Sequence, residues 1–228
     1  MKVLSCLIWA ASSYVAVLIT VQCYLPRLMS SLEGHEEMGN RSLLLGTVHL
    51  PFWIIYVVSV SVAVLCGWAS SIRGDTWINV FKMIVTCGVL NMAAIIDLKL
   101  YRIPNPLILI FVMGRGLSFV AELIFDNQLL VWGMWNSVIA GGISLLLFFL
   151  ISKITHGGIG YGDVKLFSAL GFLCGMRAVI YTVILSFLLC SVVAALLLAT
   201  KKKGRKDGLP LAPFVWMGFA ATVVMGLC

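Results

Sequence analysis

Long apolar runs separated by short polar segments dominate the chain. Several are long enough to cross a membrane as helices of roughly 20 residues, namely 3–25, 51–71, 77–97, 105–125, 130–151, 177–200 and 211–228. Another run, 163–176, is too short for hydropathy alone to identify it as a crossing. The first run resembles a signal peptide in its apolar character, but its length and the lack of a clean cleavage site favour a membrane span.

Composition favours a membrane protein over a soluble one. The 228 residues are 61% hydrophobic and 11% charged, so polar side chains are too few to cover a water-exposed surface. We therefore expect an all-α, polytopic integral membrane protein with about eight transmembrane helices. Residues 1–76 would form two N-terminal helices joined by a short cytoplasmic loop, and residues 77–228 would form a six-helix core.

The cysteines do not form a pattern typical of metal or disulfide sites. No two of them have C-x-x-C spacing, and all lie in or at the ends of apolar runs. They are Cys6, Cys23, Cys66, Cys87, Cys174, Cys190 and Cys228. We interpret them as small buried hydrophobic residues, and we expect neither a metal site nor a cofactor.

Basic residues gather on one side of the membrane if the run 163–176 crosses it. The loops on that side then contain ten of the 16 basic residues, namely Arg27, Arg41, Lys99, Arg102, Lys153, Lys201, Lys202, Lys203, Arg205 and Lys206. Without that crossing, the cluster at 201–206 falls opposite Lys99 and Arg102, and the bias largely disappears. The positive-inside rule therefore favours eight crossings, with these loops in the cytoplasm and both termini outside. Membrane orientation also explains the net charge of +7 without a nucleic-acid partner.

Two acidic residues, Asp97 and Asp163, stand out by their positions at the cytoplasmic ends of apolar runs. Most of the other acidic residues lie in polar loops. Glu122 lies about one helical turn from the outer end of its run, and we expect it to reach the lipid headgroups. An ionised carboxylate at membrane depth costs at least about 2.5 kcal/mol, so it needs water, a partner or a proton.

Asp97 and Asp163 could meet this need together. Two carboxylates that share a site release their protons in separate steps, so one is protonated while the other is charged. An aspartic protease uses this arrangement: the charged carboxylate takes a proton from the attacking water, and the neutral one gives a proton to the carbonyl oxygen. A simpler interpretation is that each aspartate caps a helix end. The spacing alone leaves both interpretations open.

Glycines next to Asp163 favour the catalytic interpretation. In "HGGIGYGD" (156–163), Gly158, Gly160 and Gly162 leave the backbone bare beside the carboxylate, so an extended peptide could lie against it. A phosphate-binding loop fits poorly, because no strand precedes the glycines and no lysine follows at P-loop spacing.

Three segments resemble signatures of the type IV prepilin peptidases. The segment "GGIGYGDVKLFSALG" (157–171) resembles their glycine–x–glycine–aspartate motif. The segment "IIDLKLYRIPNPL" (95–107) resembles their first aspartate block, and "LPLAPFVWMGFAA" (209–221) resembles the block that opens their last helix. The three follow the family's order and cover roughly residues 77–228, which would then be the peptidase core.

The resemblance implies an aspartic endopeptidase of the bacterial inner membrane, with Asp97 and Asp163 as catalytic residues. Such enzymes remove a basic leader peptide, after a glycine, from type IV prepilins or pseudopilins at the cytoplasmic face. The expected partners are therefore the prepilin substrate and the lipid bilayer. Substrate binding or loop shaping would fall to Gly158, Gly160, Gly162, Pro104, Asn105 and Pro213.

The N-terminal quarter departs from the family pattern. Larger members carry a cytoplasmic insert with two C-x-x-C pairs that bind zinc, and this region accompanies methylation of the new pilin N-terminus from S-adenosylmethionine. Here the corresponding loop ends near Leu50 and contains no cysteine. We therefore expect a peptidase that lacks zinc and lacks methyltransferase activity.

Two other classes of protein also place acids in membranes. A proton-coupled transporter predicts an internal hydropathy repeat and acids near the bilayer midplane, and the sequence shows neither. A catalytically silent pilus-assembly scaffold is disfavoured because both aspartates and the glycines are present. Near the aspartates, we expect Lys99 and Lys165 to reach the cytoplasmic headgroups, and Asn105 to cap the span that follows it.

Overall fold

The computed structural model describes residues 7–12, 15, 52–125, 130–155, 158–200 and 209–228, and the regular elements among them are helices. After a short helical stretch at 7–12, the helices are α3 (Phe52–Arg73), α4 (Trp77–Leu100), α5 (Asn105–Phe125), α6 (Leu130–Ile154), α7 (Tyr161–Cys174), α8 (Met176–Ala199) and α9 (Ala212–Met225). The all-α prediction is confirmed. Most of the predicted span 3–25, the loop after it and the cluster at 201–206 lie outside the described residues.

The helix boundaries follow the predicted apolar runs. Helix α5 has the predicted bounds, whereas α4 and α6 each extend by three residues beyond the predicted run. Glycine separates α7 from α8, because Gly175 has a φ of 86° that other residues rarely adopt. A Cβ atom at this position would also lie only 2.7 Å from Asn136 Nδ2. A larger residue would therefore both strain the backbone and clash with Asn136.

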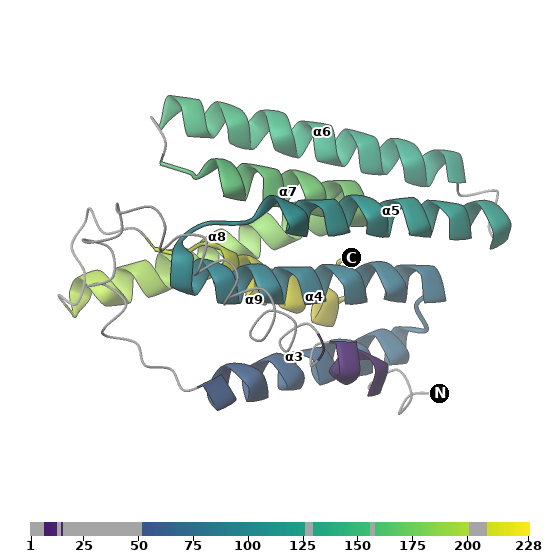
Figure 1. Ribbon diagram of the computed structural model, residues 1–228, viewed down its shortest axis with the longest axis horizontal. Helices are drawn as coiled ribbons and strands as arrows, with labels where there is room; N and C mark the ends of the chain where they lie inside the picture. Colours follow the sequence, from purple (N-terminus) through teal and green to yellow (C-terminus); the bar gives the residue numbers. More distant parts are fainter. Residues whose placement is uncertain (1–6, 13–14, 16–51, 126–129, 156–157, 201–208) are drawn as a thin grey trace.

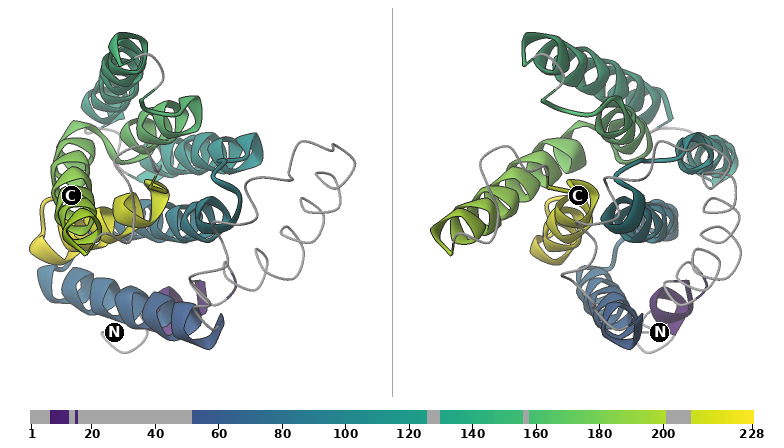
Figure 2. Two further views of the ribbon diagram at one scale, coloured as in Figure 1. Left: turned by 90° about the vertical axis from the view of Figure 1, so that its left-hand side faces the viewer. Right: turned by 60° about the vertical axis from the view of Figure 1, so that its left-hand side comes forward.

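Successive helices run back and forth through one bundle (Figure 1). Helix α4 contacts α3, α5, α7 and α9, and helix α7 contacts α4, α5, α6 and α8. Helices α5, α6 and α8 lie around α7, and α3, α5 and α9 lie around α4 (Figure 2). This topology brings the end of α4 and the starts of α5, α7 and α9 to one end of the bundle, which we call the aspartate end.

Helix length and composition support a polytopic membrane protein. Among the described residues, 4 helices are long and apolar enough to cross a membrane: Trp77–Leu98, Asn105–Phe125, Val131–Ile154 and Met176–Ala199. Inside the bundle, 56% of the α4 window is buried but only 11% of the α8 window, so α8 presents most of its surface to lipid. Helices α7 and α9 have 14 residues each. Each is therefore about 21 Å long, shorter than a hydrocarbon layer of roughly 30 Å. The number of eight crossings stays a prediction.

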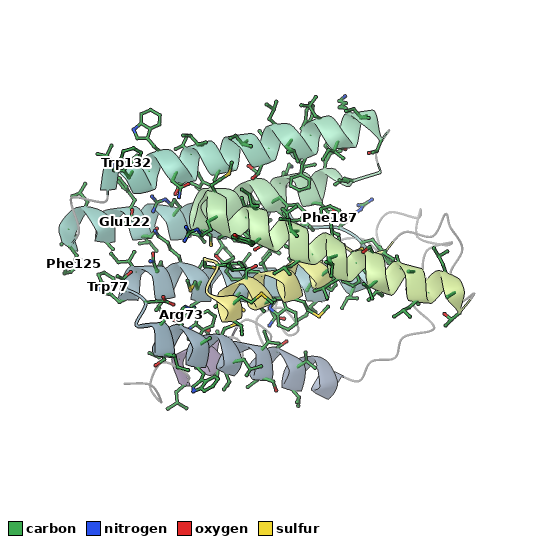
Figure 3. All side chains as sticks on the ribbon, turned by 180° about the vertical axis from the view of Figure 1, so that it is seen from behind. Arg73, Trp77, Glu122, Phe125, Trp132 and Phe187 are labelled. Carbon is green, nitrogen blue, oxygen red and sulfur yellow. The ribbon has the colours of Figure 1, made fainter. Side chains whose placement is uncertain are left out.

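Aromatic side chains mark the other end of the bundle, which we call the Trp77 end (Figure 3). The rings of Trp77 and Phe125 meet edge to face with centroids 5.1 Å apart, and Trp132 is 79% exposed. Tryptophan is enriched where membranes meet water. We therefore place a membrane surface at this end.

Stacked rings hold the outer helices to α7. Phe148 of α6 stacks on Phe167 of α7 with centroids 4.3 Å apart, and Phe187 of α8 lies 6.3 Å from both rings. Phe167 is fully buried. Helix α7, whose first turn contains Asp163, is thus held in place by ring contacts with α6 and α8.

The structure contradicts the expected headgroup position of Glu122. Its carboxylate is buried and forms ion pairs with Lys82 of α4 and Arg115 of α5. Arg115 Nη1 lies 3.0 Å from Glu122 Oε2 and 3.1 Å from Ser118 Oγ. Arg115, Ser118 and Glu122 share one face of α5, because they are separated by about one and two helical turns. That face is turned toward α4, so Glu122 binds protein cations instead of reaching the headgroups.

Candidate active site

Asp97 lies in the last turn of α4, where it is only 6% exposed. Its Oδ2 accepts the backbone N–H of Ala212, the first residue of α9, at 3.0 Å. The first N–H groups of a helix have no partner within the helix and favour a negative charge. Asp97 therefore caps α9 from a neighbouring helix. Pro213 is the next residue of α9, a position where a proline costs no hydrogen bond.

A tight turn follows Asp97. Tyr101 ends α4 in the left-handed conformation, with φ 51°, and its N–H donates to the backbone oxygen of Asp97 at 3.0 Å. Pro104 then accepts the N–H of Leu107 at 3.1 Å in the first turn of α5. Pro104 and Asn105 thus lie where the loop after α4 passes into α5, and their loop-shaping role stays a prediction.

Asp163 lies in the first turn of α7 and is half-buried. Its N–H donates to Gly160 O at 3.0 Å, and Gly160 is the residue that caps this helix. Asp163 is thus a first-turn acidic residue, which the helix dipole favours, and the N-cap position belongs to the glycine.

The structure brings Asp97 and Asp163 together at the aspartate end. Helices α4 and α7 contact each other, and Asp97 in the last turn of α4 and Asp163 in the first turn of α7 lie at the same end of the two helices. One carboxylate is closed off by α9, and the other is more accessible. The two aspartates therefore lie at one end of the bundle and not on opposite sides of it.

The glycines are needed for close approach. A Cβ atom on Gly160 would lie 3.3 Å from Asp163 Oδ2, and one on Gly162 would lie 3.2 Å from Ile103 Cβ in the loop after α4. A Cβ atom on Gly158 would lie 3.0 Å from the Thr155 side chain. The lack of a side chain at Gly160 therefore leaves room beside Asp163 Oδ2, and at Gly162 it lets the loop after α4 approach the first turn of α7.

Lys165 is exposed and has a partner within the protein, and its expected position at the headgroups stays a prediction. Its Nζ donates to the side-chain oxygen of Asn105 at 3.1 Å. Asn105 is itself the first residue of α5, so the expected cap on this span is replaced by a bond to α7. The sequence gives no signal for this contact, because the two residues are far apart along the chain. His156 and the side chain of Lys99 lie outside the described residues.

Known proteins share this region of the chain. Residues 84–195 match the model of the type IV leader peptidase family, and this segment contains both aspartates and the glycines between α6 and α7. Over these residues the chain is similar to the type IV leader peptidase family. The family match covers most of α4, all of α5 to α7 and most of α8, and so includes both carboxylates, on α4 and α7.

Curated relatives in this family carry the name Prepilin leader peptidase/N-methyltransferase. The protein of Bacillus subtilis is 27% identical over 158 residues, which is 69% of this chain and 61% of the relative. The protein of Pseudomonas aeruginosa is 26% identical over 165 residues, which is 70% of this chain and 54% of the relative. A protein of Burkholderia pseudomallei is 31% identical over 105 residues. The matches thus span somewhat more than half of the first two relatives. No solved structure matches the chain.

Proposed function

We propose that the chain is an aspartic endopeptidase that removes the leader peptide from type IV prepilins or pseudopilins, with Asp97 and Asp163 as its catalytic pair. The observation that carries this proposal is that α4 and α7 pack together, with Asp97 in the last turn of one and Asp163 in the first turn of the other, beside bare glycine backbone. Similarity to the leader peptidase family, and the name given to the relatives, support the substrate class.

The pair suits water activation, because two interacting carboxylates hold one proton between them over a range of pH. Asp97 fits the ionised role, since the Ala212 N–H and the start of α9 stabilise negative charge on it. The water oxygen would attack the scissile carbonyl carbon while Asp97 takes a proton from that water. At the same time Asp163 would protonate the carbonyl oxygen. Asp97 would then protonate the leaving amine, and Asp163 would recover its proton from the diol as the C–N bond breaks.

We propose that cleavage takes place at the cytoplasmic face. Arg102 and Lys153 lie at the aspartate end, and the positive-inside rule places basic loops in the cytoplasm. The Trp77 end would then face outward. The pilin's apolar helix would meet the site within the membrane, and its extended leader would lie against the glycine backbone.

We also propose that the chain does not methylate its product. The proposal rests on the cysteine-free sequence between the first two apolar runs, a loop that lies outside the described residues. The relatives' name includes N-methyltransferase, so the two activities have to be tested together.

Intact mass spectrometry of purified prepilin, incubated with the purified chain and S-adenosylmethionine, tests both proposals. The expected product lacks a leader that ends in glycine and carries no added methyl group. A product with one added methyl would contradict the absence of methyl transfer. Prepilins from several families that all stay intact would contradict the peptidase.

Activity is expected to pass through a maximum as pH changes. One carboxylate must be ionised and the other protonated, so cleavage falls at low pH, where both are protonated, and at high pH, where both are charged. Single-turnover rates measured across the pH range, with folding checked at each end, will show this profile. A rate that does not change with pH over several units would contradict a shared proton.

Gly160→Ala is expected to lower the cleavage rate by about tenfold, because the added methyl would crowd Asp163 Oδ2, 3.3 Å away, and misplace the carboxylate. Gly116→Ala is the matched control, since a Cβ atom on that exposed glycine of α5 meets nothing within 4 Å. Equal loss of activity in both variants would show that crowding at Asp163 is not the cause.

A further inference from the structure

Two contacts join the segment after Asp97 to the first two turns of α7, which carry Asp163. In the first, Ile103 packs against the bare backbone of Gly162, the residue just before Asp163. In the second, Lys165 Nζ donates to Asn105 Oδ1 at 3.1 Å. Asn105 begins α5 just after the turn that Tyr101 ties back to the Asp97 backbone. Together these contacts connect the segment that follows Asp97 to the start of α7, where Asp163 lies.

We propose that Lys165 is a positioning residue, whose ammonium group holds Asn105 and so fixes the separation of Asp97 and Asp163. Lys165 follows Asp163 by two residues in α7, and residues two apart on a helix point in different directions. Lys165 Nζ accordingly donates a hydrogen bond to Asn105 of α5 and not to the carboxylate of Asp163. This role rests on the proposed peptidase activity.

The effect should appear in turnover and not in substrate binding. A shift of about 1 Å in a reacting group lowers rates by as much as a hundredfold. Because the Ile103 contact with Gly162 stays in place, we expect about tenfold lower kcat for Lys165→Met, with KM unchanged. If Lys165 instead faced the basic leader, removing its charge would weaken repulsion and lower KM.

Matched variants separate positioning from other roles. Lys165→Arg keeps a cationic donor for Asn105 and should retain most of the activity. Asn105→Ala should lose as much activity as Lys165→Met, and the double variant should lose no more, because both remove one bond. Lys153→Met is the control, since this exposed lysine lies in the last turn of α6 at the aspartate end. Its Nζ lies over the Phe149 ring of its own helix and not on Asn105.

Steady-state cleavage of a prepilin by these variants tests the proposal, alongside amide hydrogen exchange. In Lys165→Met and Asn105→Ala we expect faster exchange in segments 101–107 and 158–164, with wild-type exchange in Lys165→Arg. Full activity in Asn105→Ala with loss in Lys165→Met would overturn the proposal, as would unchanged exchange in both. If the wild-type chain cleaves nothing, the peptidase proposal fails by itself, and exchange still decides whether the contact fixes the loops.

Discussion

Replacing Asp163 by asparagine is expected to lower the single-turnover rate of prepilin cleavage by about a thousandfold. Asparagine has nearly the same shape, but its amide cannot carry the proton that the scissile carbonyl oxygen requires. The half-buried position in the first turn of α7 accepts a neutral side chain, so the fold should persist. Rates are measured with enzyme in excess over a purified prepilin, and folding is checked by helical circular dichroism.

Asp97 offers a second version of this test, because it has a structural bond as well as a proposed chemical role. Asp97→Asn should be as inactive as Asp163→Asn but remain folded, since the amide oxygen still accepts the Ala212 N–H. Asp97→Ala should also lose the α9 cap, at a cost of about 1 kcal/mol. Asp75→Asn, a change of the same kind at the Trp77 end, should keep full activity. Wild-type turnover in either asparagine variant at 97 or 163 would contradict the catalytic pair.

Glu122→Gln is expected to destabilise the protein by about 3–5 kcal/mol. The change would remove the negative partner of buried Arg115 and of partly buried Lys82. The Nη2 atom of Arg115 already has no hydrogen-bond partner among the described residues, so loss of the Glu122 carboxylate would remove the ion pair of this guanidinium without a replacement. Denaturant unfolding in detergent micelles measures the loss.

Two further variants make this prediction specific to a buried charge. Asp75→Asn breaks the more exposed ion pair with Arg73 and should cost no more than about 1 kcal/mol. Adding Lys82→Met to Glu122→Gln removes one unpaired cation, so the double variant should recover part of the lost stability. If Glu122→Gln unfolds like Asp75→Asn, the ion-pair cluster is not a main source of stability.

The apolar runs predicted the helices because each run is a local property of the chain. Asp97 and Asp163 could likewise be selected from sequence, since each ends an apolar run and the neighbouring motifs resemble those of one family. The structure places both at the end where α4 finishes and α7 begins. The catalytic role of the pair, the glycines and Pro213 remains a prediction.

The contacts between distant segments could not be predicted in this way. The sequence predicts a headgroup position for Glu122 because it shows only how far this residue lies from the end of its apolar run. That the side chain points toward Lys82 depends on how α4 and α5 pack. The Lys165–Asn105 bond and the Ala212–Asp97 bond also join segments that only the fold brings together. Hydropathy records which residues avoid water, but it carries no information on partners across helices.

The most direct test of the catalytic pair compares Asp97→Asn, Asp163→Asn and the double variant in single-turnover cleavage of one prepilin. Residues that act as one unit lose the same activity whether one or both are removed. We therefore predict that all three variants fall to the same residual rate, far below wild type. A double variant much slower than either single variant would show that the two aspartates act independently, and would contradict the shared water.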